Sequence, residues 1–158
     1  MTQKEILTGL VLECLDSRKW RYDIQDQDDQ RFTLSFGMNL KSKLSSCRVI
    51  VIINQDSIQV LAICPIKATE DVYGPVTEYL TRANFGLIVG KFEFDYRDGE
   101  IRYQSVLPCS AGTPQMKDVE RVLDVPFLMM QRYGNGLMKN LMGIGYPEED
   151  IREAQNDQ

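Results

Sequence analysis

The stretch that decides the fold is CRVIVIINQDSIQVLAIC, residues 47–64. It contains two runs rich in β-branched residues, 47–53 and 58–64, which are separated by a short polar turn. Such runs are typical of β-strands, and because their apolar residues fall on both faces, we expect them at the centre of a sheet. A turn centred on the bond between Gln55 and Asp56 sets an antiparallel register. That register pairs Ile53 with Ile58, Val51 with Val60, Val49 with Ala62, and Cys47 with Cys64.

This register sets two of the four cysteines, Cys47 and Cys64, directly opposite each other. We interpret them as small buried hydrophobes, because free cysteine is among the most buried residue types. A redox pair or part of a metal site is the alternative. Cys14 falls on an apolar helix face, whereas Cys109 follows a proline in a loop and is expected to be the most exposed thiol.

Upstream of the central strands, the pattern predicts a helix and a hairpin. Thr2 and Glu5 have the spacing of a capping box, and apolar residues then recur at helical spacing on one face to about Asp16. Apolar and polar residues alternate in 20–24 and again in 32–40. This alternation predicts a half-buried hairpin joined by a polar link.

Downstream, the pattern predicts a second helix and a second hairpin. The helix begins near Pro75, ends between Asn84 and Gly86, and turns its apolar residues inward. These inward residues are Val76, Tyr79, Leu80 and Ala83. In the hairpin, Asp98-Gly99 has the composition of a two-residue turn with positive φ at both positions. That turn pairs Tyr96 with Ile101, Phe94 with Tyr103, and Asp95 with Arg102, with the aromatic face in the core.

The C-terminal third is predicted to be helical. A helix opens at Thr113 and Pro114, and we expect Pro126 to kink or restart it, because proline lacks an N–H and clashes with the preceding turn. The last helix then extends to about Met142. Residues 148–158 are polar and are expected to form a frayed tail, so that the single domain spans 1–147.

The order of these elements predicts the fold class. A helix, four strands, a helix, two strands and one or two final helices are typical of an α+β domain, in which an antiparallel β-sheet is flanked by helices. The length of 158 residues fits one compact domain of this kind.

The composition excludes several classes of chemistry. The chain contains no histidine, so it has no Ser-His-Asp or Cys-His pair and no histidine ligand for a metal or haem. Asp23, Asp26, Asp28 and Asp29 lack the glycine and the bidentate glutamate of a calcium loop. Glu93 and Asp95 have predicted cross-strand partners in Gln104 and Arg102. We therefore assign no catalytic, cofactor-binding or metal-binding residue and expect no enzyme activity.

The charge balance narrows the range of partners. The 18 basic and 23 acidic residues give a formal net charge of −5, which disfavours binding to nucleic acid or to an anionic membrane. No apolar run approaches the roughly 18 residues of a membrane span. The cysteines lack CxxC spacing, which fits a reducing compartment. We expect a cytoplasmic protein without a nucleic-acid or membrane partner.

A family resemblance enters with ANFGLIVGKFEFDYRDGEIRYQSVLP, residues 83–108. This stretch has a helix ending in Asn, a Gly-x-Phe strand start, an Asp-Gly-Glu turn and an aromatic return strand. It resembles the YbjN-type family of uncharacterised bacterial regulator-like proteins, which share their architecture with the class I chaperones of type III secretion. The resemblance implies a non-enzymatic regulatory or chaperone-like protein, often a dimer, and it carries over no catalytic residue.

The last helix supplies a candidate partner-binding surface. Met130, Tyr133, Leu137 and Leu141 cluster on one side of it at 100° per residue and suffice to face the sheet. The shoulder beside them carries Leu128, Met138 and Met142, and methionine suits adaptable binding surfaces. We therefore expect a homodimer that binds a partner polypeptide there. Packing of the first helix or of the segment before Pro126 on this shoulder is the structural alternative, and a small-molecule-binding or cryptic enzymatic domain is the functional one.

Overall fold

The computed structural model describes residues 1–156. The helices are α1 (Gln3–Ser17), η1 (Glu70–Val72, a 3-10 turn), α2 (Tyr73–Asn84), α3 (Met116–Leu141) and α4 (Pro147–Asn156). The strands are β1 (Asp23–Gln27), β2 (Phe32–Asn39), β3 (Ser46–Ile53), β4 (Ser57–Ile63), β5 (Lys91–Phe94) and β6 (Ile101–Pro108). All neighbouring strands pair antiparallel in one sheet of order β1-β2-β3-β4-β6-β5. The α+β class and the expected order of elements are confirmed.

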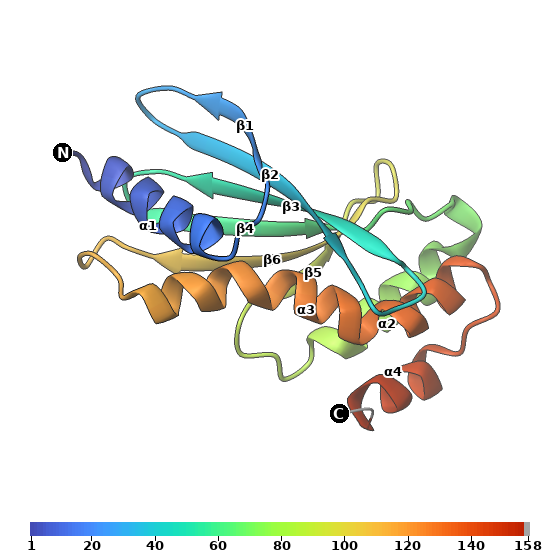
Figure 1. Cartoon of the computed structure of the whole chain (residues 1–158). Helices are drawn as coiled ribbons and strands as arrows, with labels where there is room; N and C mark the ends of the chain where they lie inside the picture. The colour runs from blue at the N-terminus through green and yellow to red at the C-terminus, as the bar shows by residue number, and fades with distance from the viewer. Residues whose placement is uncertain (157–158) are drawn as a thin grey trace.

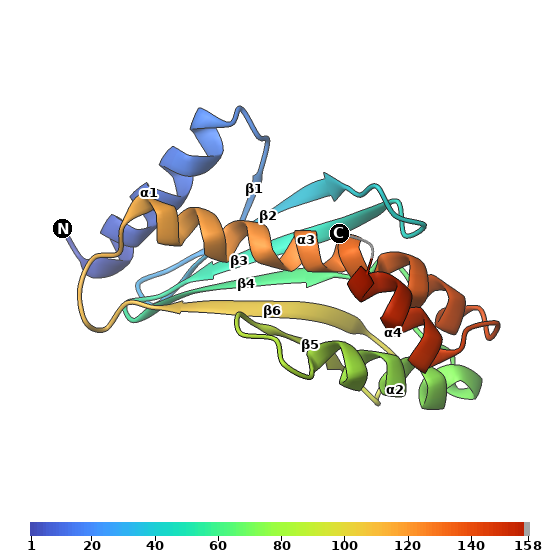
Figure 2. The same cartoon turned by 90° about the horizontal axis from the view of Figure 1, so that it is seen from below.

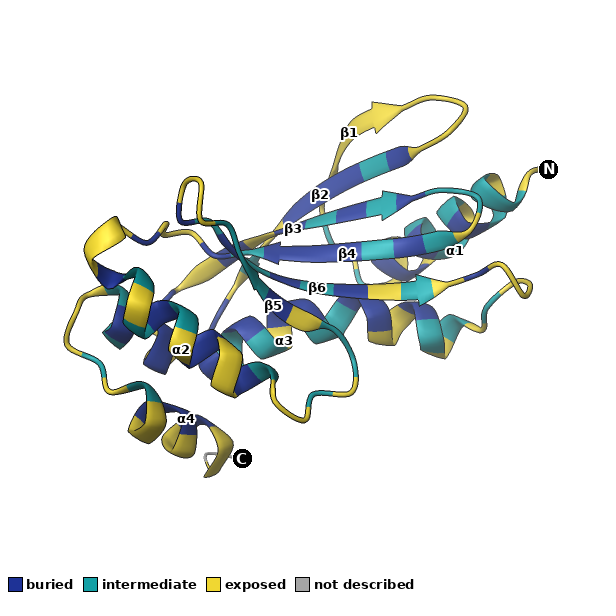
Figure 3. Cartoon of the chain, turned by 180° about the vertical axis from the view of Figure 1, so that it is seen from behind, coloured by how far each residue is buried: buried dark blue, intermediate teal, exposed yellow. Residues whose placement is uncertain are grey.

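The helices lie on one side of the sheet (Figures 1 and 2). α3 runs over β3, β4 and β6, α1 packs beside it, α2 covers β5, and α4 packs on α2 and α3. The core lies between these helices and the sheet, and it includes every second residue of the central strands, such as Val49 and Val51. No described element covers the opposite side of the sheet (Figure 3).

The central strands have the predicted register. Ile53 pairs with Ile58, Val51 with Val60, and Val49 with Ala62. Cys47 and Cys64 lie one step beyond the last pair of this ladder, and both are buried. The predicted inward residues of α2 (Val76, Tyr79, Leu80 and Ala83) are all buried, so the periodicity identified the correct helix face.

The β5–β6 register differs from the prediction by two residues. Phe94 pairs with Ile101 and Phe92 with Tyr103, so Tyr96 lies outside the strand and is exposed. The turn is longer because the Asp95 carbonyl accepts a hydrogen bond from Gly99 N–H at 2.7 Å, which closes an extra turn of backbone. Gly99 has the predicted positive φ of 80°, whereas Asp98 does not.

Pro126 does not end or restart the helix, because α3 is continuous through it. A proline at this position removes the N–H that would bond the carbonyl four residues earlier, that of Val122. In this protein the buried Ser105 hydroxyl of β6 donates to the Val122 carbonyl oxygen at 2.8 Å. The hydrogen bond that the helix lacks is thus replaced from the sheet.

The expectation of a frayed tail at 148–158 is wrong for its described part. Residues 148–156 belong to α4, which buries Ile151, Ala154 and the carboxylate of Asp150 against the rest of the molecule. Two apolar residues in a polar segment gave too weak a periodicity to indicate a packed helix. Residues 157 and 158 lie outside the described part of the chain.

The first hairpin is also more exposed than predicted. β1 is exposed along its whole length, because it is an edge strand of the sheet. Its partner β2 buries Phe32, Leu34 and Phe36 as expected.

Candidate functional site

The structure separates the three residues of the predicted partner-binding shoulder. Leu128 and Met142 are 47% and 65% exposed, whereas Met138 is half-buried and packs against the core. Leu128 lies on α3 and Met142 caps its C-terminal end, 14 positions later, which corresponds to about 21 Å along a helix axis. They lie at opposite ends of the shoulder rather than in one compact patch.

The middle of that shoulder is covered by the β2–β3 loop. Lys41 N–H donates to the Gln131 side chain at 3.0 Å, and Lys43 N–H donates to the Asn135 side chain at 2.7 Å. The loop approaches α3 closely at Gly134, where a Cβ atom would overlap the side chain of Ser42. The β2–β3 loop, a segment that the sequence analysis did not name, thus packs on the middle part of this shoulder.

A second group of apolar side chains lies where α3 turns into α4. Met142, Ile144 and Tyr146 are 65%, 66% and 69% exposed, and we call these three residues the α3–α4 patch. The sequence analysis placed only Met142 on a binding surface. The signal that could have identified the other two is a pair of large apolar residues in a Gly- and Pro-flanked turn, where burial in a core is not expected.

The backbone under the α3–α4 patch is held by a dense set of hydrogen bonds. Gly143 has a φ of 74°, and the bonds from Gly143 N–H to Asn140 O (3.2 Å) and from Ile144 N–H to Lys139 O (3.0 Å) form a Schellman cap. The buried Asp150 carboxylate accepts from Tyr146 N–H at 2.8 Å and from the Asn140 side chain at 3.0 Å. The turn therefore holds its exposed apolar side chains on an ordered frame.

The α2–β5 loop carries two more exposed apolar residues, Phe85 and Ile88, both almost fully exposed. Next to it, the side chain of Asn84 binds both backbone groups of Phe92, accepting from its N–H at 2.7 Å and donating to its carbonyl at 3.0 Å. The sequence analysis placed Asn84 only at the end of the second helix. The structure shows that this residue also closes the outer edge of β5.

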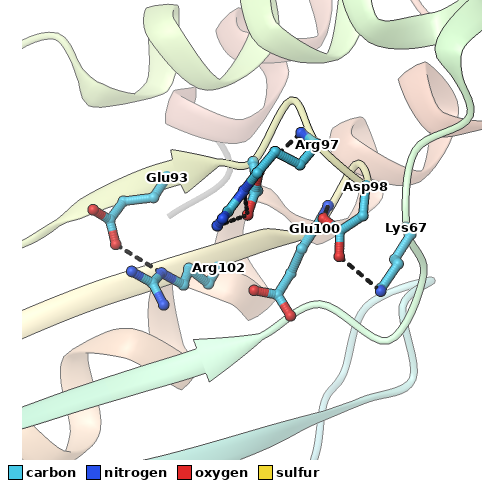
Figure 4. Close-up of polar contacts among 7 residues, drawn as sticks. Lys67, Glu93, Arg97, Asp98, Glu100 and Arg102 are labelled. Carbon is cyan, nitrogen blue, oxygen red and sulfur yellow. Dashed lines mark hydrogen bonds and ion pairs between the residues drawn. The ribbon is translucent and has the colours of Figure 1, made fainter.

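Charged residues gather around the β5–β6 turn, and Figure 4 shows most of them in ion pairs. Arg102 contacts Glu93 at 2.8 Å, and Lys67 contacts Asp98 at 2.9 Å. The Arg97 guanidinium beside Asp95 lowers the pKa of that carboxyl to about 2. A carboxylate of this kind is ionised near neutral pH, so it cannot donate a proton as a general acid. The arrangement stabilises the turn.

The buried thiols are poor nucleophiles. Burial raises the pKa of Cys47 to about 12, with a smaller contribution from the neighbouring Cys64, and raises the pKa of Cys64 to about 11. Since the thiolate is the reactive form, both thiols are protonated and unreactive near neutral pH. Cys109, predicted to be the most exposed thiol, is buried, and its N–H donates to the Asp56 carbonyl at 2.7 Å.

Metal-binding clusters and membrane-spanning helices, within residues 1–156, would indicate other functions. Within this range no group of three or more Cys, Asp or Glu residues is placed to hold a metal ion. None of the helices in the same range has the length and apolar character needed to cross a membrane.

Comparisons with known proteins identify no relative. No family model matches the chain, and neither the curated proteins nor the solved structures contain a match to it. The resemblance of residues 83–108 to the YbjN-type family therefore stays a prediction, and the function must be argued from the site.

Proposed function

We propose that this chain is a non-enzymatic protein-binding module, regulatory or chaperone-like, that acts in the cytoplasm as a homodimer. Its partner is an apolar segment of another polypeptide, and the α3–α4 patch is the surface that binds it. The observation that carries this proposal is the exposure of Met142, Ile144 and Tyr146 on a turn whose backbone is held by the Schellman cap and by the bond to Asp150.

Exposed apolar groups of this kind favour binding for an energetic reason. Large contiguous apolar patches on a protein surface mark interaction sites, whereas scattered single residues do not. A surface that is already ordered loses little conformational entropy on binding, which leaves more of the contact energy for affinity. Methionine and tyrosine are also enriched at the centres of protein interfaces.

Affinity capture from the cytosol of the source organism, with mass spectrometry, tests the proposal. The wild-type chain should retain a reproducible partner in stoichiometric amount, and the double variant Met142→Glu with Ile144→Glu should lose it. Both side chains are solvent-exposed, so the thermal midpoint should stay within about 3 °C of the wild type.

The matched control is Phe85→Glu with Ile88→Glu, which makes the same change in charge at two exposed apolar residues of the α2–β5 loop. This variant should capture the partner as well as the wild type. Loss of the partner in the control alone would place binding on the α2–β5 loop, and equal capture by all three proteins would refute the α3–α4 patch.

A further inference from the structure

The uncovered side of the sheet has an apolar centre that belongs to no part of the core. Ile50 and Ile52 of β3 and Leu61 and Ile63 of β4 point to this side, alternating with the core residues of the same strands. We call these four residues the open-face patch. Leu61 is only 5% exposed although it lies outside the core, because its neighbours on the open face surround it.

Polar and charged groups border the open-face patch. Cross-strand pairing places Gln104 beside Leu61 and Arg102 beside Ile63 on the neighbouring β6. On the other flank, Ser35 of β2 lies beside Ile50 and accepts a hydrogen bond from Arg48 at 3.0 Å. An apolar centre within a polar border is the usual composition of a protein interface.

The size of the open face suits a complex of two such sheets. Six strands about 4.8 Å apart, each about seven residues long at about 3.3 Å per residue, cover roughly 650 Å². Two faces of this size bury about 1,300 Å² when they pack together, within the range of specific interfaces. Sheets that pack face to face in this way lie about 10 Å apart, as in β-sandwiches.

The charges at the two edges of the sheet determine which symmetry is favourable. The register places Asp23 and Asp26 of β1 on the open side, opposite Ser35 and Thr33. At the other edge, Lys91 of β5 also points to the open side, opposite Gln104. One edge of the open face thus carries Asp23 and Asp26. The other carries Lys91, which is 57% exposed and lies 3.7 Å from the carboxylate of Glu93 on the same face.

We propose that two copies of this chain pack their open faces together about a two-fold axis parallel to the strands, an interface that rests on the homodimer of the proposed function. Because β3 and β4 are the middle strands of the order, this axis places β3 of each copy over β4 of the other. Ile50 of each copy then faces Leu61 of the other. The same axis places β1 over β5, so Asp23 faces Lys91 at both edges.

The alternative two-fold axis, across the strands, is electrostatically unfavourable. It would place β1 over β1 and so bring the acidic residues of β1, Asp23 and Asp26, close to the same strand of the other copy. Like charges that are brought together at an interface oppose association, whereas opposite charges select the register. The axis parallel to the strands is therefore the one that the charges favour.

Sedimentation equilibrium of the full chain tests the interface. The wild type should form a species of twice the 18.1 kDa chain mass at tens of micromolar. Ile52→Glu places a carboxylate in the interface twice and should raise the dissociation constant about 100-fold. Leu128→Glu, a similar change on the helical side, should leave that constant unchanged. A monomeric wild type, or a dimer that tolerates Ile52→Glu, would overturn the proposal.

A charge swap tests the orientation of the two copies. It uses exposed residues, whose substitution should leave the fold intact. Asp23→Lys and Lys91→Asp should each raise the dissociation constant about 10-fold, because each introduces like charges at both edges. The double variant restores opposite charges and should return to within about threefold of the wild type. Additive weakening in the double variant would refute the two-fold axis parallel to the strands.

The two proposals fail separately. Partner capture by a monomeric Ile52→Glu variant would show that the α3–α4 patch works without the dimer. If the wild type is a dimer and the Ile52→Glu and charge-swap variants behave as expected, but no partner is captured, the α3–α4 patch is refuted and the open-face interface is supported.

Discussion

At the residue scale, single side chains allow residues in α3 that are unfavourable inside a helix. Pro126 lies inside a continuous helix because Ser105 supplies a hydrogen bond to Val122 that the helix itself cannot make. Gly136 leaves room for Tyr79, whose hydroxyl donates to the Tyr133 carbonyl at 2.7 Å. Ser105 thus compensates for Pro126, and Tyr79 requires the glycine at 136. Both Ser105 and Tyr79 come from distant parts of the chain.

The pairing of Ser105 with Pro126 makes a prediction that a double-mutant cycle can measure. Ser105→Ala should lower the free energy of unfolding by about 1–3 kcal/mol, because the buried Val122 carbonyl loses its partner. In a Pro126→Ala background the backbone N–H of residue 126 can bond that carbonyl, so the same Ser105→Ala change should cost less. Urea denaturation of the four proteins gives the coupling energy, and simple additivity would contradict the explanation.

At the element scale, the two edges of the sheet are protected in different ways. β1 carries exposed acidic residues and a register shift between Ile24 and Asp26, both of which oppose pairing with another strand. β5 is closed by Asn84, the last residue of α2, which binds both outward backbone groups of Phe92. This contact also joins α2 to the sheet.

Asn84 should therefore matter for stability. We expect Asn84→Ala to lower the free energy of unfolding by about 1–3 kcal/mol, since two backbone groups lose their partner at once. Asn84→Asp should be destabilising too, because a carboxylate oxygen would then face the Phe92 carbonyl oxygen. Urea denaturation measures both effects, with the exposed Asn39→Ala as the control, which should change stability by less than about 0.5 kcal/mol. If the Asn84→Ala variant is as stable as the wild type, water replaces the side chain at the Phe92 N–H and carbonyl with no change in the free energy of unfolding.

At the scale of the whole molecule, one sheet and one core connect the two ends of the fold. Trp20 lies where α1, β2 and α3 meet, with its ring 5.6 Å from that of Phe36 and 6.0 Å from that of Phe127. The Arg18 guanidinium lies over this ring at 4.7 Å and also contacts Asp124 of α3. At the other end, α4 packs on α2 and α3.

Trp20 is the single tryptophan, so its fluorescence reports on the N-terminal end alone. If the chain is one cooperative domain, the urea transition followed by this fluorescence should coincide with the transition followed by far-UV circular dichroism. The midpoints should agree within experimental error, and so should the slopes. An earlier fluorescence transition would show that the end around α1 unfolds independently and that the chain has more than one cooperative unit.

The local pattern of the sequence determined the class of fold, the position of most helices and strands, the buried face of α2 and the register of the central strands. It also placed Leu128, Met138 and Met142 on one shoulder of the last helix; Leu128 and Met142 are exposed, whereas Met138 is half-buried. These features follow from periodicity and turn chemistry, which act over a few residues. Neighbouring positions alone therefore suffice to predict them.

The tertiary structure decided the features that need a partner far away in the chain. The helix passes Pro126 because Ser105 of β6 reaches it, and the last segment becomes α4 because Asp150 and Ile151 find buried places against α2 and α3. The continuity of the predicted shoulder on α3 was decided in the same way, by the β2–β3 loop that covers Gln131. No local pattern encodes such contacts, because their energy exists only once the distant segments have met.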